Sequence, residues 1–127
     1  MDIKPVLTMR EAVGRYIPDG QEVMIGGFAF SDPTALAHEL IRQRRKGLYV
    51  MKTSGGVLLD MLIGAGCVDR VLFCHIWNSV GPVPAHCFRR ALEQGIPNPV
   101  GTSDHHGFVA KLGPPQRAKL RLRNEPW

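Results

Sequence analysis

Two adjacent glycines, Gly26 and Gly27, follow an apolar run at residues 23–25 and precede Phe28. Glycine has no Cβ, so the backbone can turn sharply there and approach a ligand closely. When such a turn joins a strand to a helix, free amide N–H groups can face a phosphate or a developing oxyanion. On its own, such a glycine pair predicts either an anion-binding loop or a turn that only connects a strand to a helix.

The residues that follow favour the start of a helix directly after the loop. Ser31 or Asp32 can cap that helix, and Pro33 suits its first position, where a missing N–H costs nothing. The partly positive end of the helix would then point at the bound group. The glycines whose amides could face that group are Gly26 and Gly27.

A second polar segment follows the next predicted strand. Hydroxyls and free amides at a strand's carboxyl end can bind a carboxylate or a thioester oxygen, although a capped turn explains such residues equally well. Asn78, after the third predicted strand, is a candidate of the same kind. The candidates in the second segment are Thr53, Ser54, Gly55 and Gly56.

Other side chains with potential chemistry receive a structural interpretation. His75 lies in an apolar strand, which is typical of a core histidine. His86 and Cys87 lack a neighbouring acid at a spacing that would form a nucleophile pair. Asp60 is expected on the solvent face of a helix and Asp69 in a turn.

Strands and helices alternate along the chain, which indicates an α/β fold with a mostly parallel sheet, flanking helices and right-handed crossovers. In such sheets, ligands bind beyond the carboxyl ends of the strands, where both glycine pairs fall. A capping box at Thr8–Glu11 starts the first helix, and Met9, Val13 and Tyr16 form its apolar stripe. The strand at 23–27 is expected to be buried on both faces. The remaining expected elements are helices at 33–46, 57–65 and 85–94 and strands at 48–54 and 68–77.

Composition narrows the function classes. The 127 residues carry a net charge of +5, but residues 98–127 hold five of the 16 Lys and Arg and only two of the 11 Asp and Glu. No aromatic side chains are interleaved with the basic residues, so nucleic-acid binding is not expected. The three cysteines are odd in number and lack the spacing of a zinc site. No signal peptide or membrane-spanning segment is recognised in the sequence. A soluble, cytoplasmic protein is therefore expected.

The glycine loop, within DGQEVMIGGFAFSDP, resembles the glycine-rich signature of family I CoA-transferase α subunits. The segments LLDMLIGAGCVDRVLFCHIWNSVGP and FRRALEQGIP are similar to glutaconate CoA-transferase-like α subunits, so the resemblance covers residues 5–97. Many members read Gly-Gly-Phe-Gly where this chain has Ala29. The resemblance implies a CoA-transferase (Rossmann-like) fold, incomplete at the C-terminus.

The resemblance also implies a reaction. The partner β subunit provides a glutamate that attacks an acyl-CoA thioester, and the CoA then passes to a carboxylic acid. This chain would supply the loop at Gly26, Gly27, Phe28 and Ser31 for CoA or its oxyanion, with residues 53–56 and Asn78 lining the acyl pocket. No catalytic residue, metal or tightly bound cofactor is expected in this chain, and coenzyme A thioester is the substrate.

Two alternatives remain open: a subunit of an acyl-CoA hydrolase or ring-opening enzyme of the same fold, and a non-catalytic fragment. Residues 1–97 are expected to form a partial CoA-transferase-like domain. Residues 98–127, with His105 and His106, are expected to be an irregular or disordered tail. A frameshifted or truncated reading frame would explain the abrupt change of character at residue 98.

Overall fold

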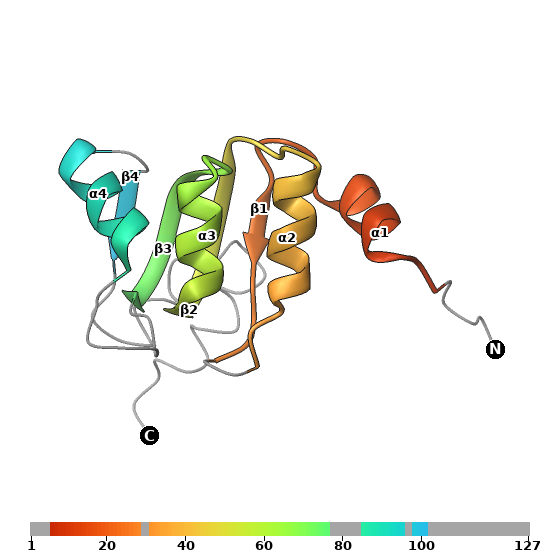
Figure 1. The fold of residues 1–127 in the computed structure, drawn as a ribbon, viewed down its shortest axis with the longest axis horizontal. Helices are drawn as coiled ribbons and strands as arrows, with labels where there is room; N and C mark the ends of the chain where they lie inside the picture. The colour runs from red at the N-terminus through yellow and green to blue at the C-terminus, as the bar shows by residue number, and fades with distance from the viewer. Residues whose placement is uncertain (1–5, 29–30, 77–84, 96–97, 102–127) are drawn as a thin grey trace, which may run out of the picture.

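The computed structural model describes residues 6–28, 31–76, 85–95 and 98–101. Helices and strands alternate through these ranges (Figure 1). The elements are α1 (Met9–Tyr16), β1 (Glu22–Met24), α2 (Thr34–Arg42), β2 (Leu48–Gly55), α3 (Val57–Gly64), β3 (Val68–Ile76), α4 (His86–Gln94) and β4 (Asn98–Gly101).

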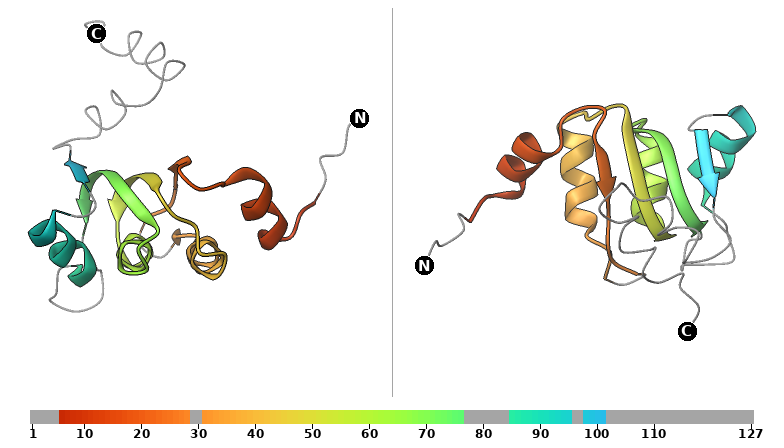
Figure 2. Two further views of the ribbon diagram at one scale, coloured as in Figure 1. Left: turned by 90° about the horizontal axis from the view of Figure 1, so that it is seen from above. Right: turned by 180° about the vertical axis from the view of Figure 1, so that it is seen from behind.

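The four strands form one sheet in the order β1-β2-β3-β4, and every neighbouring pair is parallel. Each crossover passes through a helix, and α2, α3 and α4 all lie on the same face of the sheet (Figure 2). The carboxyl ends of the strands consequently meet at one edge of the sheet, the lower edge in Figure 1. The expected α/β class with a parallel sheet and flanking helices is confirmed.

The main core lies between the sheet and its helices. Val50 and Val71 pair in register on β2 and β3, and both are fully buried. Leu40 of α2 and Leu62 of α3 pack into the same cluster. Met51 and Leu72, one residue further along each strand, belong to a smaller cluster on the opposite face, because successive strand residues point to opposite sides.

Strand β1 differs from the expectation. It is three residues long, and Met24 is 55% exposed, while Ile25, just after the strand, is buried. The prediction that this strand is buried on both faces is wrong, because β1 pairs only with β2 among the described strands and Met24 lies on its uncovered side.

Helix α1 confirms the capping box but not the whole apolar stripe. Thr8 Oγ1 accepts a hydrogen bond from the Glu11 N–H, and the Glu11 carboxylate accepts one from the Thr8 N–H. Val13 is buried, but Met9 and Tyr16 are exposed because α1 packs beside α2 at one end of the fold (Figure 1).

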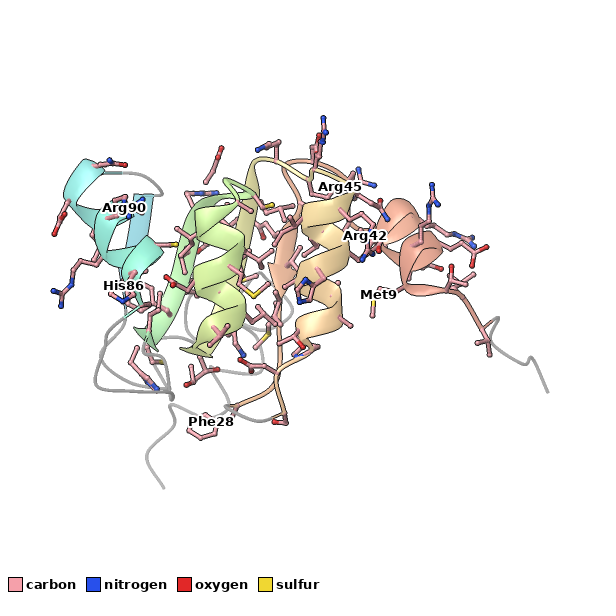
Figure 3. The ribbon with its side chains drawn as sticks, in the orientation of Figure 1. Met9, Phe28, Arg42, Arg45, His86 and Arg90 are labelled. Atoms are coloured by element: carbon pink, nitrogen blue, oxygen red, sulfur yellow. The ribbon has the colours of Figure 1, made fainter. Side chains whose placement is uncertain are left out.

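Helix α2 is shorter than predicted. It begins at Thr34 and ends at Arg42, and Arg44 then adopts a left-handed backbone with φ of 55°. Residues 42–46 form a basic run of three arginines and one lysine, which therefore lies mostly beyond the helix, and Gly47, with a φ of 69°, follows it. Figure 3 shows Arg45 at the opposite edge of the fold from Phe28, with Arg42 between α2 and α1.

Strand β4 lies within the first residues of the segment expected to be irregular. Its backbone pairs with β3 from Arg70–Asn98 to Phe73–Gly101. The expectation of irregular structure is wrong for residues 98–101, because the sheet continues into a fourth parallel strand there. The rest of the tail, including His105 and His106, lies outside the described residues.

Candidate binding site at the carboxyl edge of the sheet

The glycine loop leaves β1 at the carboxyl edge of the sheet. Gly27 has a φ of +101°, a conformation that side-chain-bearing residues rarely adopt. A Cβ at Gly27 would lie 2.7 Å from the Ser31 carbonyl oxygen and 3.1 Å from Asp32 Oδ1. Glycine is therefore required at this position both by the backbone and by close packing.

A buried lysine lies behind this loop. Lys52 is two residues after Val50 on β2, so its side chain points toward the helix-covered face. It is fully buried, and its Nζ donates to the Gly27 carbonyl at 2.9 Å and to Asp32 Oδ1 at 2.8 Å. A weaker contact of 3.5 Å reaches the Gly26 carbonyl. Lys52 is not among the residues predicted from the sequence, although a lone charge inside an apolar strand could have indicated it.

These contacts orient the amide groups of the loop. In a trans peptide the carbonyl and the following N–H point in opposite directions. Because the Gly26 and Gly27 carbonyls face Lys52, the N–H groups of Gly27 and Phe28 face away from it. The Phe28 N–H donates to Ser31 Oγ at 3.1 Å. Gly26 and Gly27 are exposed residues, and their N–H groups donate no hydrogen bond to another described residue.

Ser31 and Asp32 do not cap α2. Ser31 closes a turn, since its N–H and its hydroxyl both donate to the Phe28 carbonyl at 3.0 Å. Asp32 instead binds Lys52, with its side chain only 8% exposed. Pro33 occupies the cap position itself, with no side-chain hydrogen bond. The cap prediction is wrong because the Ser31 hydroxyl bonds within the loop and the Asp32 carboxylate bonds Lys52. The Phe28 ring projects at the carboxyl edge of the sheet (Figure 3).

Ser54 and His75 come together at the same edge. They pair in register at the ends of β2 and β3, and Ser54 Oγ lies 2.9 Å from His75 Nε2. His75 is exposed, so the prediction of a core histidine is wrong. His75 lies near the end of β3, where neighbouring elements no longer cover its side chain. There it contacts Ser54, one of the residues predicted from the sequence.

The other residues of the second segment have distinct settings. Thr53 is half-buried in β2, and Gly56 is the N-cap residue of α3, with no side-chain cap. A Cβ at Gly55 would lie 2.8 Å from Leu59 Cδ2, so this glycine permits close packing. Asn78 lies outside the described residues, as does Ala29.

Three further carboxylates differ from their predicted settings. Asp60 Oδ1 accepts a hydrogen bond from the Phe88 N–H at 2.9 Å, so it caps α4 from α3 instead of facing solvent. Asp69 lies within β3, at the point where the register with β2 shifts. A helical glutamate would ordinarily face solvent, but Glu39 of α2 is buried and bonded to Gln43 and Arg42.

Three groups away from the loop have shifted pKa values. Hydrogen bonds from Thr8 lower the pKa of Glu11, and the hydrogen bond from Gln43 lowers the pKa of Glu39. Burial raises the pKa of the Cys67 thiol. Among the described residues, no cluster of three or more His, Cys, Asp or Glu side chains is arranged to hold a metal ion. No helix in these ranges has the length and apolar character needed to cross a membrane.

Residues 6–95 match the family model for coenzyme A transferase. The chain belongs to this family. It is 40% identical over 100 residues to the A subunit of 3-oxoadipate CoA-transferase from Pseudomonas knackmussii, covering 79% of this chain and 35% of that protein. The A subunit of glutaconate CoA-transferase from Acidaminococcus fermentans is 32% identical over 91 residues, covering 71% of this chain and 28% of that protein. This CoA-transferase family chain thus spans about a third of the length of these relatives.

Solved structures agree with this assignment. Glutaconate CoA-transferase of Acidaminococcus fermentans superposes with a TM-score of 0.71 at 29% identity, covering 76% of this chain and 31% of that one. A cysteine-to-serine variant of the decarboxylase AibA/AibB superposes with a TM-score of 0.73 at 25% identity, covering 95% of this chain and 51% of that one. The family fold is therefore found in proteins named for two different reactions.

Proposed function

We propose that this chain is part of a CoA-transferase α subunit, which moves CoA between an acyl-CoA thioester and a carboxylic acid. The observation that carries this proposal is the glycine loop at the carboxyl edge. Gly26 and Gly27 are exposed there, and their carbonyls face the buried Lys52, so the Gly27 N–H, which follows the Gly26 carbonyl, points away from Lys52. Amides held in this way can donate to the thioester oxygen as negative charge develops on it.

The nucleophile of the proposed reaction belongs to a β subunit. Glu11 holds the start of α1, and Glu39 is a buried residue of α2 that accepts a hydrogen bond from Gln43. Glu22 begins β1 and Glu93 is near the end of α4, so both lie away from the strand ends that carry the loop. Within the described ranges no glutamate accompanies the glycine loop. We further propose that the partner subunit carries this glutamate, that the two subunits form a heteromer, and that the assembly is cytoplasmic.

We assign the acyl group to the neighbouring Ser54–His75 pair. The two curated relatives are named for 3-oxoadipate and glutaconate, both of which are dicarboxylic acids. A hydroxyl and an imidazole at an exposed strand end can donate to the second carboxylate of such an acyl chain. Phe28, 66% exposed at the same edge, supplies apolar surface for the bound thioester.

The test is reconstitution with the subunit encoded next to this chain. The assembled pair should exchange CoA between succinyl-CoA and acetate, and hydroxylamine or borohydride should trap the label on a partner glutamate. The chain alone should show no transfer and no adduct. A labelled peptide that contains Glu11, Glu22, Glu39 or Glu93 would contradict this division of labour.

A second reaction class remains as an alternative. The AibA/AibB protein is named a decarboxylase, so the fold alone does not select CoA transfer. If the partner subunit lacks the glutamate, the assembly cannot form the covalent intermediate. Hydrolysis of the thioester or ring opening by the assembled pair, with no trapped adduct, would then support the alternative, and an inert pair would indicate a non-catalytic fragment.

A further inference from the structure

The buried Lys52–Asp32 pair calls for an explanation beyond stability. The Lys52 side chain is 0% exposed and that of Asp32 is 8% exposed. Removing two charges from water costs about as much as their attraction returns, so apolar residues of similar volume often serve a core equally well. A buried pair of this kind is better explained by the geometry it imposes, which here is the geometry of the glycine loop.

All three protons of the ammonium group have acceptors around the loop. One goes to the Gly27 carbonyl at 2.9 Å, one to Asp32 at 2.8 Å, and the third approaches the Gly26 carbonyl at 3.5 Å. Asp32 therefore fixes the ammonium, and the ammonium fixes two consecutive carbonyls. Because each carbonyl points inward, the following N–H points outward.

The same contact also changes the donor strength of the loop. A cation at a carbonyl oxygen polarises the peptide, and linked hydrogen bonds of this kind strengthen one another in a low-dielectric interior. Lys52 lies behind the Gly26–Gly27 peptide, whose N–H belongs to the exposed residue Gly27 and points to the other side. The Gly27 N–H should therefore be a stronger donor than an ordinary loop amide.

We propose that Lys52, held by Asp32, is a positioning residue that turns the Gly27 N–H outward and polarises it toward an anionic thioester oxygen. The part that concerns the ligand rests on the proposed function. The part that concerns the loop does not, because the orientation of the amides is a property of the chain without ligand. The two parts therefore need separate measurements.

The experiment compares the ¹⁵N-labelled 127-residue chain with two variants, Lys52→Met and the double variant Lys52→Met/Asp32→Asn. Lys52→Met leaves the Asp32 carboxylate buried without its partner and is expected to lose stability. The double variant removes both charges at similar volume, so it should fold with a melting temperature near that of the wild type. Lys46→Met is the matched control, because Lys46 Nζ also donates to a glycine carbonyl, that of Gly66 at 3.2 Å, outside the site.

In the double variant, the Gly27 and Phe28 amide resonances should move, and the hydrogen exchange of the Phe28 N–H, which donates to Ser31 Oγ, should accelerate about tenfold or more, as expected when a charged hydrogen bond that holds the loop is lost. Its affinity for acetyl-CoA should fall about tenfold or more for the same reason. Asp32→Asn alone, which keeps an oxygen acceptor for the ammonium, should show smaller changes. Lys46→Met should behave as the wild type.

Wild-type amide exchange in a folded double variant would overturn the proposal, since Lys52 would then not orient the loop. Failure of the double variant to fold would also contradict it, because the pair would then be a structural requirement. If the wild-type chain does not bind acetyl-CoA, the proposed function fails, while the amide exchange still decides the positioning role.

Discussion

Lys52 Nζ lies 2.9 Å from the carbonyl oxygen of Gly27, and this contact joins the second strand to the loop that leaves the first. Through it, a residue of the sheet interior fixes the backbone of the most exposed part of the candidate site. The same loop is shaped by the positive φ of Gly27 and by its close approach to Ser31 and Asp32. Each of these features can be changed separately.

Gly27→Ala should reduce ligand binding more than folding. The added Cβ meets the Ser31 carbonyl oxygen and is strained by the positive φ, so the loop must move. Gly20→Ala is the matched control, because Gly20 also has a positive φ but its Cβ would meet nothing within 4 Å. Both variants should lose about 1–2 kcal/mol from backbone strain. Only Gly27→Ala should also lose affinity for acetyl-CoA, measured by calorimetry. Equal affinities in the two variants would make Gly27 purely structural.

Ser54→Ala and His75→Gln should change substrate selectivity. If the pair binds a second carboxylate, each variant should raise the KM of the assembled enzyme for succinyl-CoA by about tenfold, the usual loss for one hydrogen bond to a charged group. The KM for butyryl-CoA, which lacks that carboxylate, should stay unchanged. Parallel losses with both thioesters would remove the Ser54–His75 pair from acyl recognition.

Asp60→Ala should loosen α4. The Asp60 carboxylate accepts the Phe88 N–H in the first turn of that helix, and loss of such a cap costs about 1 kcal/mol. Hydrogen exchange at Phe88 should accelerate, and the melting temperature should fall by about 4–8 °C per kcal/mol in a domain of this size. Glu93→Ala, an exposed acid on the same helix, is the control and should change neither quantity.

The alternation of strands and helices predicted the parallel sheet correctly, because the spacing of apolar residues in a strand differs strongly from that in a helix, as residues 48–76 show. The site was predicted only in part. Sequence spacing located Gly26 and Gly27, but it could not show that Asp32 turns away from the helix start to meet Lys52. It also could not show that His75 becomes exposed at the strand end beside Ser54, because that depends on where the covering elements stop.

Stability should depend on pH through Glu11. The side-chain hydroxyl and backbone N–H of Thr8 lower the pKa of Glu11 in the folded chain, so the unfolded chain binds this proton more readily. The stabilisation is present above the ordinary glutamate pKa of about 4.3 and is lost as the pH falls through the lowered value. Urea unfolding should therefore show Glu11→Gln less stable than wild type at neutral pH, with the difference shrinking in acid. A difference that is the same at both pH values would contradict this.

The central claim is that the Gly26 and Gly27 amides bind a CoA thioester, and the most direct measurement is a titration of the ¹⁵N-labelled chain with acetyl-CoA. We expect saturable downfield shifts of the Gly26 and Gly27 N–H signals, with Gly20, Gly47 and Gly66 unchanged. Shifts confined to the basic run at residues 42–46, or no change at millimolar acetyl-CoA, would contradict the claim.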